Sequence, residues 1–246
     1  MAVVVLMPAF NEGTKIADVL AAMPKSLLGR DLLVVVIDDG STDGTADIAE
    51  SSGASVIRQP SNQGKGAALA VGLDHVRSLG CEATVWMDSD GQHLPESLSR
   101  IVAPVLFDDI DLCVGSRYLD ERQRHSAPLN RRLVRQMAIG AVQRITGYHV
   151  TDPFSGFRCL SRRALETVHL EGRGYESELE SCFAVARAGL TYREVPIPRI
   201  YGPGTSKMGH RRGALIGRIA VVAGYRRTIN QAEYATSRAE GALVRG

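Results

Sequence analysis

The chain has 246 residues, of which 44% are hydrophobic and 23% are charged, and its formal net charge is +2. This length is enough for one large α/β domain or for two small ones. The small net charge and the 5% of aromatic residues, which are not interleaved with basic ones, argue against a nucleic-acid-binding protein.

Up to residue 118, strand-like apolar runs alternate with segments of helical spacing. The runs predicted as strands are 2–7, 32–37, 55–58, 83–87 and 111–116. Helical spacing covers 14–23 and 67–79, and Pro95 begins a further helix. This alternation predicts βαβ units, and therefore an α/β fold with a mostly parallel sheet flanked by helices.

The second part of the chain is less regular. Its predicted elements are a basic helix at 130–145, a short strand after the turn at 151–158, a helix at 176–188, a strand at 191–197 and a last helix at 211–230. We predict one domain over 1–210 and a C-terminal helical segment over 211–246. The apolar stretch 214–225 is too short to span a membrane and lies between arginine pairs, which is typical of a helix on a membrane surface. Packing on the domain or on a second subunit would explain the same pattern, so a homo-oligomer stays open.

Compartment signals are few. No stretch reaches the ~18 apolar residues of a spanning helix, and Pro8 stops the first apolar run before it could serve as a signal peptide. The four cysteines are widely spaced and form no C-x-x-C pair, which indicates buried free thiols in a reducing compartment. We therefore expect a cytoplasmic protein, either soluble or peripheral on the inner membrane face.

Two acidic residues, Asp88 and Asp90, follow the continuous apolar run 83–87, which predicts a strand buried on both faces. In parallel sheets ligands bind at the carboxyl ends of the strands, and two nearby carboxylates repel unless a cation lies between them. Their oxygens suit Mg²⁺ or Mn²⁺, which usually also binds phosphate oxygens. Alternatively, Asp88 caps the next helix and Asp90 forms an Asx turn.

Two further loops follow predicted strands and should lie at the same edge of the sheet. Gly64-Lys65-Gly66 is not a P-loop, because the spaced first glycine and the Ser or Thr after the lysine are missing, but its amides can face a ligand. Asp38 and Asp39 resemble the acidic pair Asp88 and Asp90, but they open a loop rich in Gly, Ser and Thr, which also suits Asx turns and helix caps. Neither loop is specific alone.

Six motifs in a fixed order make the sequence similar to a known family. They are Pro8-Ala-Phe-Asn-Glu12, Asp38-Asp-Gly-Ser-Thr-Asp-Gly44, Asn62-Gln-Gly-Lys-Gly66, Asp88-Ser-Asp-Gly-Gln92, Gly115-Ser-Arg-Tyr118 and Asp152-Pro-Phe-Ser-Gly-Phe-Arg158. Together they resemble the GT-A-fold family 2 glycosyltransferases, and within them the dolichol-phosphate mannose synthase-like enzymes. The resemblance covers residues 2–207. It implies a metal-dependent, inverting transfer of a hexose from a nucleotide diphosphate sugar, GDP-mannose or UDP-glucose, to a polyprenyl phosphate.

The resemblance also implies roles for single residues. The nucleotide-sugar pocket would contain Pro8, Ala9, Asn11, Glu12, Asp39, Lys65, Asp88, Ser89 and Asp90. The divalent cation, Mg²⁺ or Mn²⁺, would be held by Asp88, Asp90 and Gln92. The acceptor would meet Arg117, Arg131, Ser155, Gly156, Arg158 and Lys207, and a guanidinium is a suitable partner for its phosphate. The catalytic candidates are Asp88, Asp90, Arg117, Arg131 and Asp152, the last as the best placed base if the acceptor needs one.

Several polar residues also have ordinary structural explanations. Arg117 could form an ion pair at a strand end, and Arg131 could belong to a charged helix face. His93 could be a ligand itself, or it could cap a helix or support a ligand residue. Glu176 and Glu178 could orient the donor sugar, but solvated acids at a helix start are commoner.

One departure from the family bears on the acceptor. Close relatives carry Arg-x-x-Gly-x-Ser-Lys in a loop over the site, but here Tyr201 stands at the arginine position before Gly204-Thr-Ser-Lys207. Two other readings therefore stay open: a transferase of the same fold that acts on a soluble or protein-bound hydroxyl, and a non-catalytic nucleotide-sugar-binding protein. The intact Asp88, Asp90 and Gln92 argue against the second.

Overall fold

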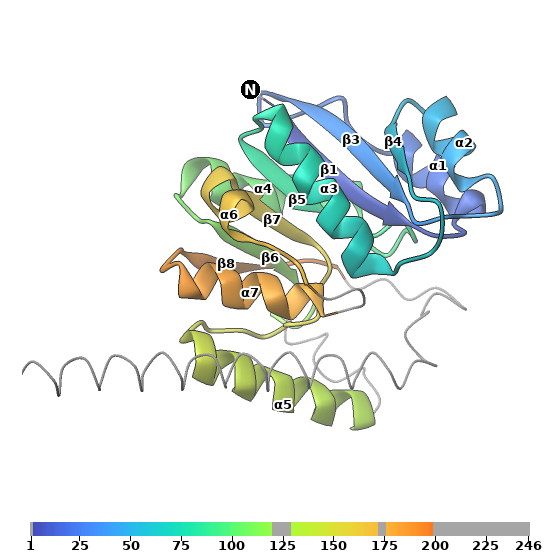
Figure 1. The fold of residues 1–246 in the computed structure, drawn as a ribbon. Helices are drawn as coiled ribbons and strands as arrows, with labels where there is room; N and C mark the ends of the chain where they lie inside the picture. The colour runs from blue at the N-terminus through green and yellow to red at the C-terminus, as the bar shows by residue number, and fades with distance from the viewer. Residues whose placement is uncertain (1, 120–128, 172–175, 199–246) are drawn as a thin grey trace, which may run out of the picture.

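The computed structural model describes residues 2–119, 129–171 and 176–198, and the side chains from position 135 onward in the helix that begins at Leu129. The predicted segment 211–246 and the loop with Lys207 lie outside the described residues. In chain order the elements are β1 Ala2–Ala9, α1 Gly13–Ala21, β2 Ser26–Leu27, β3 Arg30–Asp38, α2 Thr45–Ser51, β4 Ser55–Arg58, α3 Lys65–Leu79, β5 Ala83–Trp86, η1 Pro95–Ser97, α4 Leu98–Phe107, β6 Leu112–Ser116, α5 Leu129–Thr146, β7 Arg158–Ser161, α6 Arg162–Thr167, α7 Ser177–Arg187 and β8 Tyr192–Pro196 (Figure 1).

The described strands form one eight-stranded sheet in the order β2-β3-β1-β5-β7-β6-β8, with β4 also paired to β3. The pairs β1–β3, β1–β5, β3–β4 and β6–β8 are parallel, which confirms the predicted mostly parallel α/β sheet. The short β7 runs antiparallel to both β5 and β6 and separates them. The sequence pattern did not predict this place in the middle of the sheet, because β7 pairs with β6 across the long segment between Ser116 and Arg158.

The sheet lies between two layers of helices (Figure 1). Side chains alternate across a strand, so Val4 and Leu6 of β1 face the core under α3, whereas Val3 and Val5 face the core that contains α1 and α4. All four are fully buried. Each such side chain contributes roughly 1.5–3 kcal/mol by its burial. The strand β5 is buried along its whole length, as its continuous apolar run predicted.

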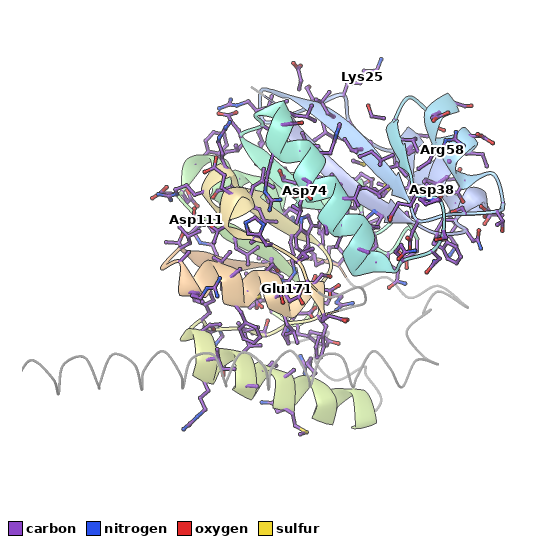
Figure 2. The ribbon with its side chains drawn as sticks, in the orientation of Figure 1. Lys25, Asp38, Arg58, Asp74, Asp111 and Glu171 are labelled. Atoms are coloured by element: carbon purple, nitrogen blue, oxygen red, sulfur yellow. The ribbon has the colours of Figure 1, made fainter. Side chains whose placement is uncertain are left out.

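The strand ends determine where polar loops meet. Parallel strands β1, β3, β4 and β5 place their carboxyl ends at one edge of the sheet, so the loops after Ala9, Asp38, Arg58 and Trp86 gather there. Figure 2 shows Asp38 and Arg58 close to one another at this edge, where they are register partners. Among the described residues, no helix combines the length and the apolar character that a membrane crossing requires.

Candidate functional site

The loops after β1 and β3 are tied together by hydrogen bonds. The backbone N–H of Asn11 donates to Ser41 Oγ (2.9 Å), and the Asn11 side-chain oxygen accepts the N–H of Thr42 (3.0 Å). Asn11 has a φ of 52°, a left-handed conformation that asparagine tolerates better than most residues. The N–H of the buried Glu12 donates to Thr45 Oγ1 (2.9 Å). These bonds hold two of the predicted nucleotide-sugar residues, Asn11 and Glu12, against the acidic loop.

Asp39 draws a third loop to the same place. Its carboxylate accepts the backbone N–H groups of Gln63 and Gly64, both at 2.8 Å, and its own N–H donates to Ala9 O (2.9 Å). Ser89 Oγ in turn donates to Pro8 O (2.9 Å). The predicted nucleotide-pocket residues Pro8, Ala9, Asp39 and Ser89 therefore lie together at this edge of the sheet.

Two buried polar atoms at this edge are unsatisfied. Within the described residues, Asp38 Oδ1 and Gln59 Nε2 have no hydrogen-bond partner. Asp38 ends β3, and Gln59 follows β4, the strand paired with it. A buried donor and a buried acceptor without partners are costly, at about 1–3 kcal/mol each, unless a ligand or water meets them. Their position beside Asp39 is consistent with a polar ligand such as a nucleoside.

Asp88 forms an ion pair with Lys65. Lys65 Nζ, from the first turn of α3, lies 2.7 Å from Asp88 Oδ1 and 3.0 Å from Glu178 Oε1 of α7. Burial by itself would raise the pKa of Asp88, but the charge of Lys65 overcomes it and lowers that pKa to about 2. Burial likewise opposes the charge on Lys65, yet Asp88 and Glu178 hold its pKa above the usual range. Asp88 and Lys65 are therefore both charged at neutral pH.

Asp90 differs from Asp88 in its partners. Its two oxygens accept the backbone N–H of Gln92 (3.0 Å) and the Gln92 side-chain amide (2.7 Å). Burial, and then the charges of Asp88 and Glu12, raise the pKa of Asp90 to about 6. A carboxylate in this position is relieved by a cation, and the carboxylate and amide oxygens here are ligands that Mg²⁺ and Mn²⁺ accept. Within the described residues, no three His, Cys, Asp or Glu side chains converge to hold a metal, so water or phosphate oxygens would complete its shell.

His93 supports the loop that carries these acids. Its Nδ1 accepts the backbone N–H of Asp88 (3.1 Å), and its ring stacks on Phe157 with the centroids 4.9 Å apart. Burial, as the largest cause, lowers the pKa of His93 to about 4, so the ring is neutral at neutral pH. Of the roles considered from sequence, this contact favours a supporting residue.

Arg117 and Asp152, both predicted near the acceptor, form an ion pair. Arg117 Nε lies 2.7 Å from Asp152 Oδ2, and Arg117 Nη2 lies 3.0 Å from Asp152 Oδ1. The backbone N–H of Arg117 also donates to Asp152 Oδ2 (3.2 Å). Burial works to raise the pKa of Asp152, but Arg117 overrides it and holds that pKa below its usual range. Asp152 is almost inaccessible, whereas about a quarter of the Arg117 side chain (24%) stays exposed. The accessible group of this pair is therefore the guanidinium of Arg117 and not the carboxylate of Asp152.

Glu194 of β8 fixes the turn that carries Asp152. Its carboxylate accepts the backbone N–H groups of Thr151 (2.9 Å) and Asp152 (3.1 Å), and Tyr192 Oη donates to it (2.8 Å). This residue was not singled out from the sequence. Its only signal was a charged residue in the middle of a short apolar strand.

Arg158, predicted on the acceptor side, lies inside the turn that follows Asp152. The side chain is fully buried, with Nε on Ser155 O (2.7 Å), Nη2 on Pro153 O (2.9 Å) and Nη1 on Ser181 Oγ (2.9 Å). Two backbone carbonyls of the turn and the Ser181 hydroxyl of α7 therefore surround this guanidinium. In this structure Arg158 holds the turn that contains Ser155, which is itself fully buried, and the acceptor role of both residues stays a prediction.

Two other expectations need comment. Glu178, expected as a solvated helix-start acid, is 2% exposed and contacts Lys65. Arg131 lies on α5, but its side chain is outside the described residues, as is Lys207, so their acceptor roles stay predictions.

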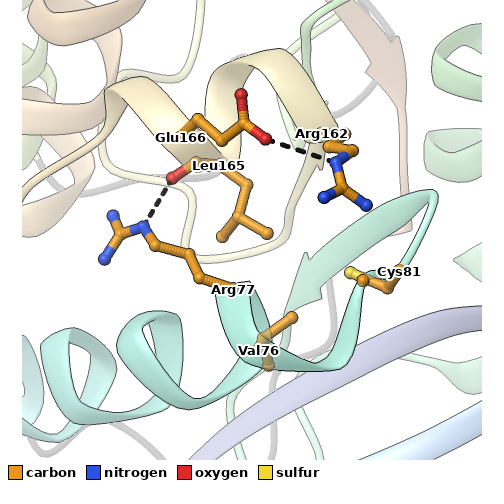
Figure 3. Close-up of a pocket in the computed structure, with 7 residues that line it drawn as sticks. Val76, Arg77, Cys81, Arg162, Leu165 and Glu166 are labelled. Atoms are coloured by element: carbon orange, nitrogen blue, oxygen red, sulfur yellow. Dashed lines mark hydrogen bonds and ion pairs between the residues drawn. The ribbon is translucent and has the colours of Figure 1, made fainter.

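A separate pocket lies at the other end of β5 (Figure 3). It is formed between α3 and α6 around Cys81, which precedes the strand, whereas Asp88 follows it. Arg77 Nε donates to Leu165 O (3.0 Å) and Arg162 Nε to Glu166 Oε1 (3.2 Å), so both arginines in this pocket have structural partners. The pocket is not part of the candidate site.

Comparison with known proteins gives a consistent result. The family model described as "Glycosyl transferase family 2" matches residues 4–168. An undecaprenyl-phosphate mannosyltransferase of Micrococcus luteus is 30% identical over 90% of this chain and 92% of its own length. A UDP-N-acetylglucosamine--dolichyl-phosphate N-acetylglucosaminyltransferase of Methanococcus voltae is 27% identical over 80% of this chain and 84% of its own. Among solved structures, glucosyl-3-phosphoglycerate synthase of Mycobacterium tuberculosis with Mn²⁺ and UDP-glucose aligns with a TM-score of 0.69 and 25% identity, over 91% of this chain and 79% of that one.

Proposed function

The chain belongs to glycosyl transferase family 2, and on this premise we propose that it transfers a hexose, with inversion, from a nucleotide diphosphate sugar to a polyprenyl phosphate. The sheet matches that of GT-A structures, so the donor would bind where the loops after β1, β3 and β5 meet. GDP-mannose and UDP-glucose are the donors we would test first. Since a polyprenyl phosphate resides in a membrane, the enzyme would work as a peripheral protein at the cytoplasmic membrane surface.

The observation that supports a phosphate acceptor is the pairing of Asp152 with Arg117. A transfer to a hydroxyl needs a base, which contributes about 10²–10⁴-fold to the rate. Asp152, the best placed base from sequence, has both oxygens on Arg117 and a lowered pKa, so it is a poor proton acceptor. A phosphate monoester, with its second pKa near ~6, is already ionised at neutral pH and needs no base. What it needs is a positive group, and the partly exposed guanidinium of Arg117 provides one.

The donor side fits a divalent cation. Asp88 and Asp90, with the Gln92 side chain, would hold Mg²⁺ or Mn²⁺ at the end of β5, and a bound cation would neutralise charge on the leaving diphosphate. Asp39, Asn11 and Glu12 would form the wall that encloses the nucleoside, since their loops are already joined by hydrogen bonds. Asp152 would orient Arg117 toward the acceptor phosphate.

Transfer assays test this proposal directly. The purified protein would be incubated with Mn²⁺ and GDP-mannose or UDP-glucose, and with either a short polyprenyl phosphate, 3-phosphoglycerate or a free hexose as acceptor. Glycosyl transfer to the polyprenyl phosphate supports the proposal. Transfer only to 3-phosphoglycerate, the acceptor suggested by the structural likeness to glucosyl-3-phosphoglycerate synthase, would favour a soluble phosphorylated acceptor.

Calorimetry with Asp90→Asn tests the donor side, since metal-dependent donor binding should be lost. Donor affinity that is unchanged in EDTA would contradict the cation role.

A further inference from the structure

We propose that the ammonium of Lys65 occupies the oxygen of Asp88 that a divalent cation would use. The ammonium must therefore be displaced when that cation binds. The inference rests on the proposed function in one respect, namely that this function requires a divalent cation at Asp88 and Asp90. It concerns the protein before donor and cation arrive, and it assigns Lys65 a part in their order of binding.

The position of the ammonium is fixed from three sides. Asp88 Oδ1 lies at 2.7 Å and Glu178 Oε1 at 3.0 Å from Lys65 Nζ. The third side is the backbone of Gly156: a Cβ at that position would lie 2.8 Å from Lys65 Nζ and 2.9 Å from Asp88 Oδ2. Such distances are too short for a carbon, so the turn can approach the ion pair this closely only with glycine at this position. The ammonium is therefore enclosed by three segments that are far apart in the sequence: the loop after β5, the turn at Gly156 and α7.

The two metal-candidate acids differ in a way that supports the proposal. Asp90 receives uncharged amide N–H groups from Gln92, whereas Asp88 receives a full positive charge. Amide donors leave the negative charge of Asp90 in place. A cation that approaches both acids would therefore meet a negatively charged carboxylate at Asp90. At Asp88 it would meet a carboxylate whose charge is already neutralised by Lys65.

Glu178 gives the displaced ammonium a place to stay. It is only 2% exposed, and it already contacts Lys65, so the lysine can leave Asp88 without losing a charged partner. In that position Lys65 would lie beside the diphosphate of a donor bound at Asp88. Cation and donor would then assist one another, because the donor phosphates offer the ammonium a second anion when the cation takes Asp88. Without a donor, the cation has to compete with Lys65 and binds weakly.

The experiment measures Mn²⁺ alone, by the electron paramagnetic resonance signal of the free ion, in the wild type, in Lys65→Met and in Lys15→Met. Methionine keeps an unbranched side chain as far as the Cε of lysine and removes the ammonium. Lys15 Nζ lies 3.6 Å from Glu12 Oε2 and its side chain is 40% exposed, so Lys15→Met removes a nearby charge that does not touch Asp88. We expect Lys65→Met to bind Mn²⁺ about 10- to 100-fold more tightly than the wild type, as expected when a charged hydrogen bond no longer competes. Lys15→Met should change the affinity by less than about fivefold.

A second variant covers the case in which Lys65→Met does not fold, which circular dichroism would reveal. Of the two carboxylates that contact the ammonium, Glu178→Gln leaves Asp88 as the charged one. Lys65 should then stay on Asp88 more firmly, so Mn²⁺ alone should bind more weakly than to the wild type. Addition of a nucleoside diphosphate should tighten Mn²⁺ binding strongly in the wild type and only slightly in Lys65→Met. Unchanged or weaker Mn²⁺ binding by folded Lys65→Met, or unchanged or tighter binding by Glu178→Gln, would overturn the proposal. Because these readouts use no acceptor, a failure to transfer sugar would count against the proposed function and not against the role of Lys65.

Discussion

Arg117 and Asp152 face one another with two matched hydrogen bonds, Nε to Oδ2 at 2.7 Å and Nη2 to Oδ1 at 3.0 Å. This geometry is the strongest that an arginine and a carboxylate can form, and it fixes the plane of the guanidinium. A planar fork carries five N–H groups, of which Asp152 uses two through the side chain. The orientation of the others is thus set by a residue that is itself almost inaccessible.

The first prediction compares the two members of this pair. Arg117→Lys keeps a positive charge but cannot form the fork, and we expect the KM for polyprenyl phosphate to rise about 10- to 100-fold because a charged hydrogen bond is lost. Arg117→Ala should be more damaging to turnover than Asp152→Asn, mainly through acceptor binding. Steady-state kinetics with each variant measures both effects, after thermal unfolding has shown that Arg117→Ala is folded. If Asp152→Asn is inactive while Arg117→Ala keeps near-normal acceptor affinity, a hydroxyl acceptor replaces the phosphate.

The second prediction concerns Glu194. Because its carboxylate accepts the N–H groups of Thr151 and Asp152, Glu194→Gln should loosen the turn that orients Arg117. We expect a loss of stability of about 1–3 kcal/mol and a KM for the acceptor that rises while the KM for the donor stays within about twofold. Tyr192→Phe is the matched control, since it removes only the hydroxyl that donates to Glu194. Equal changes in donor and acceptor KM would show that Glu194 has a general structural role only.

The third prediction concerns Gly156. Its replacement by alanine would place a carbon 2.8 Å from Lys65 Nζ and 2.9 Å from Asp88 Oδ2, so the turn or the ion pair must move. We expect a loss of stability of about 1–3 kcal/mol, as for other overpacked sites, together with weaker donor binding. Gly140→Ala on α5 is the control, because its Cβ would meet nothing within 4 Å and alanine favours the helix. Thermal unfolding and calorimetry of both variants test this contrast, which would be refuted by a Gly156→Ala protein that resembles the wild type.

The fourth prediction concerns pH and the metal-free protein. Burial, with the charges of Asp88 and Glu12, raises the pKa of Asp90 from 3.8 to about 6, so the folded state is destabilised wherever Asp90 is ionised. In EDTA at pH 7.5, Asp90→Asn should therefore be more stable than the wild type, by on the order of 2 kcal/mol. The difference should shrink as the pH falls through 6 toward 4, because the wild type then takes up a proton at Asp90 and loses its penalty. Denaturant unfolding at several pH values measures the difference, and an advantage that is independent of pH would argue against an ionised Asp90 as its source.

The clustering of the donor-candidate residues was predictable because these residues follow apolar strands. Asp88 comes directly after a strand whose run of apolar residues is continuous, and parallel strands bring such loops to one edge. Arg117 follows β6 in the same way. For these residues, local sequence and a general rule of sheet topology are sufficient.

The remaining contacts depend on chain packing that no local pattern contains. Glu178 was expected in solvent because a helix start is usually exposed, but α7 packs onto the sheet and brings it to Lys65, 113 positions away. Arg158 belongs to a motif of the acceptor turn, yet its guanidinium points inward because the carbonyl groups of that turn need donors. Glu194 has no motif at all, and its role depends on the parallel pairing of β8 with β6.

The antiparallel strand β7 has a consequence for how the chain is made. By the time residue 116 has left the ribosome, β1, β3, β4 and β5 can pair with one another, whereas β6 still lacks its described partners, β7 and β8. The fully buried run Leu112–Ser116 must therefore wait for Arg158–Ser161, and until then β5 keeps an open edge. Exposed apolar edges of this kind promote association between chains. A chain released before residue 158 is thus expected to aggregate, and synthesis slowed between β6 and β7 should lower the yield of native protein.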